Sequence, residues 1–268
     1  MKKLAVIGSP VAHSKSPLIQ NSFAAALNLT YSYSTVEVTR DALPEFIERA
    51  RGGEFAGFNV TMPLKEAIVP YLDTTDGTAV NTVVHCGGKL YGSSTDGIGT
   101  VLSLLPHGGA VDETFGSELR GQNVLILGMG GAAKAASSAL CEVGACVTVL
   151  SRRETLPPLG DTVTRPWNEL QPLAAQADII INATPLGMHG NAEFENFAWL
   201  DGAKNNAVVF DFVYNPIDTA LLRAAAERRL VTIGGLRLLV LQAAASFESF
   251  TGIAVPSDVV TKVMSALH

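Results

Sequence analysis

QNVLILGMGGAAKAASSALCEVGACVTVL, residues 122–150, is the stretch that decides the fold. It predicts a strand, a helix and a second strand within about 30 residues, the size of one βαβ unit. The turn between the first strand and the helix, residues 128–133, reads GMGGAA and fits G-x-G-x-x-[GA]. Gly128 suits the tight turn, Gly130 the close approach of a diphosphate, and Ala133 the packing of helix on strand. The stretch therefore predicts a Rossmann-like dinucleotide-binding domain.

The two ends of this unit predict which dinucleotide is bound. Amides and the dipole at a helix N-terminus favour phosphate, so Gly131 and Ala132 are predicted cofactor contacts. The second strand leads into Ser151, Arg152 and Arg153, where an NAD site usually places an acid for the ribose 2′-hydroxyl. A planar guanidinium suits a 2′-phosphate instead. The sequence thus predicts NADP(H) over NAD(H), and a solvated turn beside the neighbouring glutamate stays open as the alternative.

The amino-acid composition excludes several classes of protein. The 268 residues allow one large or two small domains, and 47% are hydrophobic against 16% charged. The net charge of -6, without a long basic tract, argues against nucleic acid as a partner. Three cysteines form no CxxC pair and no metal spacing, which indicates no metal site and a reducing, cytoplasmic location. No apolar run is long enough to cross a bilayer, so no membrane association is expected.

Strands and helices alternate along the chain, which predicts an α/β protein of two lobes. A hairpin with a Gly-Gly turn is expected over residues 79–95, and residues 106–121 read as a loop before the second lobe. The other expected strands are residues 3–9, 31–38, 54–60, 178–184, 207–213 and 230–234, and the other expected helices are residues 16–29, 41–50, 63–72, 236–250 and 257–267.

The segment FNVTMPLKE, residues 58–66, places a lysine where a helix is expected to begin. Thr61 is the expected N-cap and Pro63 suits the first turn. A cation there opposes the helix dipole, so Lys65 is costly for stability unless it has a task such as proton donation. A solvated lysine neutralised by Glu66 is the equally weighted alternative.

Polar side chains gather at the junctions of the first lobe's strands and helices. In an open α/β sheet, ligands bind beyond the carboxyl ends of the strands. Residues 14–16, 59–61, 65, 81 and 95–96 stand at such junctions and supply Ser, Thr, Asn, Lys and Asp side chains. Each one alone is explained as a cap or a turn residue, but together they suit a polyhydroxylated, anionic small molecule.

The chain resembles the shikimate dehydrogenase family along almost its whole length. The resemblance rests on GSPVAHSKSP, FNVTMPLKE, AVNT, STDGIG, GMGGAAKA, NATPLGM, DFVYNP and GGLRLLVLQ in that order. It implies NADPH-dependent reduction of 3-dehydroshikimate to shikimate, in aromatic amino acid biosynthesis. It also implies a discontinuous, three-layer α/β substrate domain of residues 1–99 and 237–268, and a Rossmann-like NADP-binding domain of residues 100–236.

The resemblance assigns a role to each matching residue. Lys65 and Asp96 would form the catalytic pair, which meets what the chemistry needs, since an alkoxide forming from a ketone requires a proton and a nearby positive charge. The implied substrate contacts are Ser14 and Ser16 for the carboxylate, Asn59, Thr61, Asn81 and Gln242 for the hydroxyls and ring, and Tyr214 close by. The implied cofactor contacts, beyond those of the glycine turn, are Thr184, Val213 and Gly235.

The chain also departs from the family pattern. Ser94 stands where the family has Asn, Arg237 and Leu238 where it has Gly and Met, and Phe250 where Trp is common. Two rival functions remain: a quinate/shikimate dehydrogenase using NAD, and a non-catalytic ligand sensor on the same fold. The intact Lys65–Asp96 pair argues against the sensor. The sequence leaves a monomer and a homodimer equally open.

Overall fold

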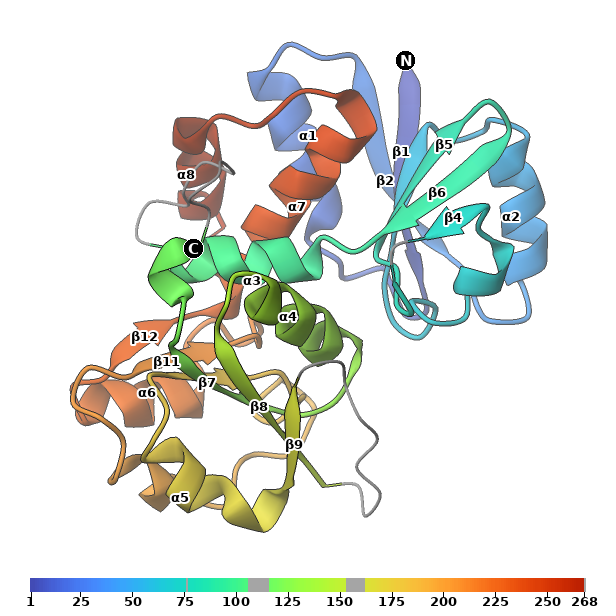
Figure 1. Ribbon diagram of the computed structural model, residues 1–268. Helices are drawn as coiled ribbons and strands as arrows, with labels where there is room; N and C mark the ends of the chain where they lie inside the picture. Colours follow the sequence, from blue (N-terminus) through green and yellow to red (C-terminus); the bar gives the residue numbers. More distant parts are fainter. Residues whose placement is uncertain (76, 106–115, 153–161, 268) are drawn as a thin grey trace. The chain divides into compact units, whose positions relative to one another are not determined.

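A computed structural model describes residues 1–75, 77–105, 116–152 and 162–267 (Figure 1). The chain divides into two compact units. The first unit comprises Met1–Asp96 and Val240–His268, and the second comprises Gly97–Leu239. Each unit is built on its own sheet and has its own core.

The first unit contains a mixed sheet in the order β2-β1-β3-β5-β6-β4. The pairs of β1 with β2 and β3 are parallel, whereas β5 runs antiparallel to both β3 and β6. The predicted hairpin is therefore confirmed, and Gly87 and Gly88 turn it with φ of 58° and 77°. The strands are β1 (Lys2–Gly8), β2 (Tyr31–Glu37), β3 (Gly57–Val60), β4 (Thr74–Thr75), β5 (Thr82–Cys86) and β6 (Lys89–Ser93).

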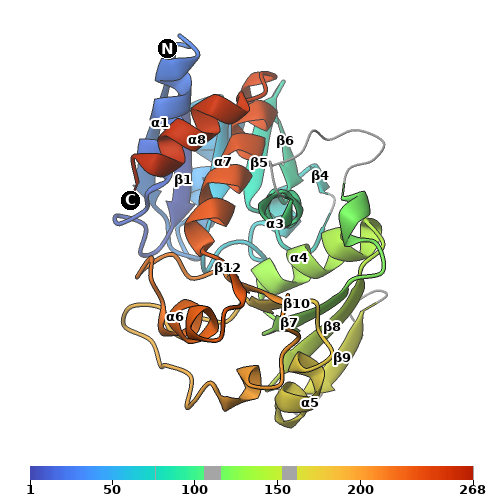
Figure 2. The same ribbon diagram turned by 90° about the vertical axis from the view of Figure 1, so that its left-hand side faces the viewer.

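Helices cover both faces of this sheet. They are α1 (Ser16–Ala26), α2 (Leu43–Arg51), α8 (Ser257–Ser265) and the part of α7 (Gly235–Thr251) that belongs to the first unit. Figure 1 shows α2 on one face and α1, α7 and α8 on the other, and Figure 2 shows the latter three side by side. Alternation along β1 explains this arrangement, because Ala5 and Ile7 pack with α2 whereas Leu4 and Val6 join the cluster that holds Phe250. The predicted three-layer α/β architecture follows from that alternation.

Residues 61–72 form turns, and the helix predicted there is absent. The segment ends in a short 3-10 helix, Val69–Tyr71. Pro70 explains the difference, because a proline cannot donate the helical hydrogen bond and its ring clashes with the preceding turn. Thr61 consequently caps no α-helix, and Lys65 does not stand at a helix N-terminus. Another feature must explain the position of this lysine.

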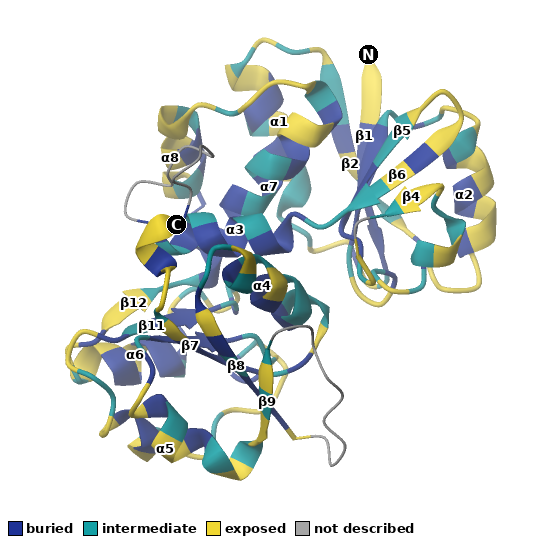
Figure 3. Cartoon of the chain, in the orientation of Figure 1, coloured by how far each residue is buried: buried dark blue, intermediate teal, exposed yellow. Residues whose placement is uncertain are grey.

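The second unit contains an all-parallel sheet in the order β12-β11-β10-β7-β8-β9. This is the doubly wound arrangement that the glycine turn predicted, so the fold class is confirmed. The strands are β7 (Asn123–Leu127), β8 (Cys146–Ser151), β9 (Val163–Pro166), β10 (Ile179–Asn182), β11 (Val208–Asp211) and β12 (Val231–Ile233). The central strand β10 is buried throughout. The edge strand β9 is largely exposed (Figure 3).

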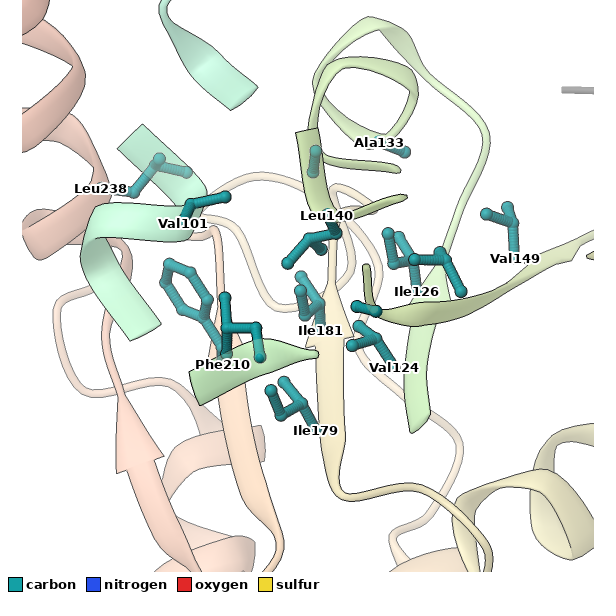
Figure 4. Packing of buried hydrophobic residues seen from close by; sticks show 14 of the residues in the cluster. Val101, Val124, Ile126, Ala133, Leu140, Val149, Ile179, Ile181, Phe210 and Leu238 are labelled. Atoms are coloured by element: carbon teal, nitrogen blue, oxygen red, sulfur yellow. The ribbon is translucent and has the colours of Figure 1, made fainter. Parts of the chain in front are cut away.

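The sheet of the second unit is also packed on both faces. Its α-helices are α3 (Asp96–Leu104), α4 (Gly131–Glu142), α5 (Leu170–Ala174) and α6 (Ala220–Glu227), with 3-10 turns at Ser117–Leu119, Trp167–Glu169 and Ala198–Leu200. On one face Ile126 and Ile181 pack with Leu140, while Phe210 packs near Val101 and Leu238 (Figure 4). A second cluster holds α5 and α6 against the opposite face. The sequence did not predict β9, α5 and α6.

Candidate active site

An ion pair marks the polar site of the first unit. Lys65 Nζ lies 2.5 Å from Asp96 Oδ2, and the two side chains are 20% and 12% exposed. Lys65 comes from the turn segment after β3, and Asp96 is the first residue of α3. The partial exposure leaves the ammonium reachable by a ligand, while the carboxylate fixes its direction. The carboxylate, rather than a helix dipole, therefore explains the position of Lys65.

Asn81 holds the other oxygen of this carboxylate. Its Nδ2 donates to Asp96 Oδ1 at 2.8 Å, and its Oδ1 accepts from the backbone amide of Thr95 at 2.8 Å. Gln242, on α7, adds its Oε1 at 3.4 Å from Asn81 Nδ2. The structure thus brings together four predicted residues, namely Lys65, Asp96, Asn81 and Gln242.

Asn59 belongs to the same network but faces inward. The hydroxyl of Tyr33 donates to its Oδ1 at 2.7 Å, and its Nδ2 donates to the carbonyl of Asn81 at 2.9 Å. The same nitrogen lies 3.1 Å from Thr82 Oγ1 and 3.0 Å from Ser246 Oγ. Burial raises the pKa of Tyr33 well above its usual value, so its hydroxyl stays protonated and remains a donor. The sequence missed Tyr33, Thr82 and Ser246, because each lies within an ordinary strand or helix pattern.

The remaining predicted substrate contacts have fewer partners. Ser14 and Ser16 are half-buried at the start of α1, where Ser14 Oγ accepts from the amide of Ser16 at 3.2 Å. Thr61 is half-buried after β3, and its backbone amide donates to Ile7 at 2.9 Å. No hydrogen bond among the described residues joins these three side chains to the Lys65–Asp96 pair. Their placement therefore leaves their predicted role open.

The glycine turn of the second unit fits a dinucleotide. Gly128 has a φ of +107°, and a Cβ there would lie 2.9 Å from Thr184 Cγ2. Gly130 is exposed, and a Cβ there would meet nothing within 4 Å, which leaves room for a diphosphate. Helix α4 begins immediately afterwards at Gly131, followed by Ala132, so its first amides point into that space.

The end of β8 suits the ribose side of the cofactor. Ser151 is buried at the last position of the strand, and Arg152 is exposed with its guanidinium 6.0 Å from the centroid of the Trp167 ring. An NAD site usually has an Asp or Glu at this place to bind the ribose 2′-hydroxyl. This chain has Ser151 and Arg152 there instead. Arg153 lies outside the described residues.

A buried carboxylate supports two loops on the same edge of this sheet. Asp211, fully buried at the end of β11, accepts from the amide of Val213 at 3.0 Å, Asn182 Nδ2 at 2.9 Å and Thr219 Oγ1 at 2.7 Å. Asn182 in turn accepts from the hydroxyl of Thr184 at 2.6 Å. Sequence analysis did not identify Asp211, although a lone acid within an apolar strand was a visible signal.

Tyr214, a predicted substrate contact, and Gly235, a predicted cofactor contact, lie next to that loop. Burial raises the pKa of Tyr214, which keeps its phenol neutral. Gly235 lets the start of α7 approach β11, since a Cβ there would lie 2.4 Å from the carbonyl oxygen of Phe212. Arg237 donates to the carbonyls of Ser103 and Leu105, at 2.9 and 2.7 Å, so its guanidinium holds the end of α3.

The described part of the chain contains neither a candidate metal site nor a helix that could span a membrane. No group of three or more His, Cys, Asp or Glu side chains in it could hold a metal ion. Within the same residues every helix is too short or too polar to span a membrane.

Comparisons with known proteins agree with this geometry. Residues 6–83 match the shikimate dehydrogenase substrate binding domain, and residues 106–211 match the NAD binding domain of D-isomer specific 2-hydroxyacid dehydrogenases. A shikimate dehydrogenase (NADP(+)) of Exiguobacterium sp. is 37% identical over 273 residues, which cover 98% of each chain. The enzyme of that name from Methanococcus maripaludis is 36% identical over 265 residues, 94% of this chain and 92% of its own.

A solved structure extends the likeness to three dimensions. Shikimate 5-dehydrogenase from Thermus thermophilus, in complex with NADP(H) and shikimate, superposes with a TM-score of 0.85. It is 31% identical in sequence, and the match covers 100% of both chains. The likeness spans both units, and the relatives align over nearly their whole length. On this ground the chain belongs to the shikimate dehydrogenase family.

Proposed function

We propose that this protein is an NADP-dependent shikimate dehydrogenase. As such it catalyses the reversible reduction of 3-dehydroshikimate to shikimate, a step of aromatic amino acid biosynthesis. The relatives of the same name support this activity, and one of them was solved with both NADP(H) and shikimate bound. The observation that carries the proposal is the partly exposed Lys65–Asp96 pair. A ligand sensor has no use for such a proton-transfer pair.

The residues of the first unit manage the proton. Bound NADPH supplies the hydride for the ketone carbon, and the ketone oxygen then develops negative charge. Lys65 Nζ stands as the donor for that oxygen and also stabilises its charge. Asp96 accepts a hydrogen bond from the same ammonium at 2.5 Å, which fixes the direction of the donor. In the oxidation direction the same pair accepts the proton of the shikimate hydroxyl.

The first unit also supplies the proposed substrate contacts. The hydroxyls of Ser14 and Ser16 bind the carboxylate, and Thr61, Asn81 and Gln242 bind ring hydroxyls. Asn59 has its oxygen and both of its amide hydrogens engaged by protein partners, so we assign it to holding Asn81 in place.

The second unit is the proposed cofactor-binding domain. Gly128, Gly130, Gly131 and Ala132 receive the diphosphate at the start of α4. Ser151, Arg152 and Arg153 bind the 2′-phosphate. The loops after β10 and β11, with Thr184, Val213 and Tyr214, line the nicotinamide side together with Gly235. The domain boundaries proposed from the sequence, 1–99 with 237–268 and 100–236, remain predictions.

The setting of the enzyme is part of the proposal. Its three cysteines are free thiols in the structure, which suits the reducing cytoplasm where we place the protein. Its partners are small molecules, shikimate and NADP(H), rather than nucleic acid or a membrane. Both a monomer and a homodimer are compatible with these assignments.

One assay tests the function. Purified protein is mixed with shikimate or quinate, each with NADP⁺ or NAD⁺, and the absorbance of reduced nicotinamide is followed. We expect the highest kcat/KM with shikimate and NADP⁺. A higher kcat/KM with quinate would assign the rival quinate activity, and a higher value with NAD⁺ would refute the role given to Arg152 and Arg153. Absence of turnover with all four pairs would leave the sensor as the better interpretation.

A further inference from the structure

The amide of Asn81 can support catalysis in only one of its two orientations. Its Nδ2 faces Asp96 Oδ1 and its Oδ1 faces the backbone N–H of Thr95, both at 2.8 Å. If the amide flipped, the Asn81 oxygen would face the Asp96 carboxylate, and the Asn81 NH₂ group would face the backbone N–H of Thr95. Both contacts would then be repulsive. The carboxylate of Asp96 would then lose the donor that holds the oxygen not bound by Lys65. A residue that fixes the orientation of the Asn81 amide therefore also fixes the Asp96 carboxylate of the proton-transfer pair.

Two hydroxyls donate to Asn81 Oδ1, that of Thr95 at 3.2 Å and, closer, that of Thr82. Thr82 Oγ1 lies 2.8 Å from Asn81 Oδ1, and the residue is completely buried at the start of β5. A side chain without exposed surface cannot touch a substrate, so Thr82 acts only through its neighbours. Its nearest acceptor is Asn81 Oδ1, since the next hydroxyls, of Ser246 and Thr95, lie at 3.2 and 3.4 Å. The Thr82 proton consequently points at Asn81.

The surrounding groups make that direction the favourable one. Ser246 donates its own proton to the carbonyl of Gln242 at 2.9 Å, so its oxygen is left as an acceptor. Asn59 presents Nδ2, a donor, to Thr82 at 3.1 Å, because its Oδ1 is occupied by the hydroxyl of Tyr33. Asn59 gives one amide hydrogen to the carbonyl of Asn81 and shares the other between Thr82 and Ser246. Thr82 thus accepts a shared hydrogen bond from Asn59 and donates to Asn81. The hydrogen bonds run in one direction, from Tyr33 to the Asp96 carboxylate, and each polarises the next.

We propose that Thr82 is a positioning residue for proton transfer, whose buried hydroxyl holds the Asn81 amide with its nitrogen toward Asp96 and so keeps the carboxylate aligned with Lys65. This inference rests on the proposed function, because it concerns the same ion pair. It adds a residue that touches neither substrate nor cofactor.

Two substitutions at Thr82 separate the hydroxyl from the shape of the side chain. Thr82→Val keeps the volume and removes the donor, whereas Thr82→Ser keeps the donor and removes a methyl group. We expect Thr82→Val to lower kcat with shikimate roughly tenfold, the effect of one buried hydrogen bond, and to leave the KM for NADP⁺ unchanged. We also expect a larger solvent deuterium isotope effect on kcat, since proton transfer becomes slower. Thr82→Ser should retain the wild-type kcat and isotope effect even where its melting temperature falls.

A second pair of variants covers the case in which Thr82→Val does not fold. Ser246→Ala removes the hydroxyl that lies beside Thr82 and Thr95, and a threefold or greater loss of kcat is expected. Ser249→Ala is its matched control, because Ser249 lies on the same helix, bonds the carbonyl four residues earlier in the same way, and is exposed. It should keep the wild-type kcat.

One readout needs no turnover. The side-chain amide resonance of Asn81, assigned by its loss in Asn81→Asp, should shift in Thr82→Val and stay in place in Thr82→Ser. A wild-type kcat in Thr82→Val or in Ser246→Ala, an equal loss in Thr82→Ser, or an unmoved Asn81 resonance would overturn the inference. Failure of the proposed function looks different, because the wild-type protein would then be inactive whatever the Asn81 resonance does.

Discussion

Each unit of this protein contains a buried carboxylate, and the two have opposite surroundings. Asp96 pairs with the ammonium of Lys65, and its side chain keeps 12% of its surface exposed. Asp211 has no exposed surface, and its hydrogen-bond donors are neutral, from Val213, Asn182 and Thr219. Asp96 is the first residue of α3, and Asp211 is the last residue of β11. Position in the fold alone therefore does not distinguish a catalytic carboxylate from a structural one.

The difference in surroundings does distinguish them. Burial raises the pKa of Asp211 to about 6, and the hydrogen bonds from Thr219, Val213 and Asn182 only partly oppose this. Such a group holds its neighbouring loops but cannot exchange protons with a ligand that does not reach it. Asp96 orients a cation that a ligand can reach. The comparison indicates that a charged partner together with access, rather than burial, distinguishes Asp96, the carboxylate to which we assign a catalytic role.

The largest expected effect comes from removing the cation. Lys65→Ala should lower kcat for shikimate oxidation by roughly 10²- to 10⁴-fold, the usual contribution of general acid–base catalysis. Lys262→Ala is a matched control, because Lys262 forms an ion pair with Asp258 on the surface of α8, where both side chains are more than half exposed. Steady-state kinetics should show no change in the control. Near wild-type turnover of Lys65→Ala would place the proton donor elsewhere and remove the basis of the comparison.

Exchanging each carboxylate for its amide tests the comparison directly. Asp96→Asn should lower kcat by about 10²-fold, because a neutral amide no longer fixes the ammonium. Asp211→Asn should change kcat by less than about threefold and act mainly on the KM for NADP⁺, since the amide would disturb the loops with Thr184 and Val213. The measurement is kcat and KM for both variants at one pH. An equal loss of kcat would mean that the two carboxylates do not differ in role.

The features that the sequence predicted correctly are local ones. The glycine turn of residues 128–133 fixes strand, turn and helix by its own backbone requirements, so it could be identified without tertiary information. The catalytic pair was predicted through family motifs, and the contact between Lys65 and Asp96 confirms that the two side chains meet. The helix predicted to begin beside Lys65 was wrong, because Pro70 interrupts it, so the helix dipole does not bear on this lysine.

The features that were missed depend on contacts between distant segments. Thr82 matters because strand β5 brings it beside Ser246, which is 164 residues away in the chain. Tyr33 reads as a core aromatic in an alternating strand, and only the fold shows its hydroxyl against Asn59. Asp211 likewise finds its donors at the end of β10 and in the loop that follows its own strand. No periodicity in the sequence encodes which buried polar groups will face one another.

The smallest expected effect is on stability, and it comes from the fully buried carboxylate of Asp211. The folded pKa of Asp211, about 6, lies above its ordinary value of 3.8, so between these pH values the folded protein holds a proton that the unfolded chain has released. This contribution to stability is complete below pH 3.8 and is lost as the pH rises through 6. The negative charge of Glu193 raises the pKa of Asp211 further. From pH 5 to pH 8 the loss of stability amounts to roughly 1 kcal/mol, and Asp211→Asn should not show it.

Urea unfolding of both proteins across this range should therefore find the wild type losing about 1 kcal/mol relative to the variant toward pH 8. Parallel curves would mean that burial does not raise the pKa of Asp211, and the contrast with Asp96 would then rest on the charged partner and on access alone.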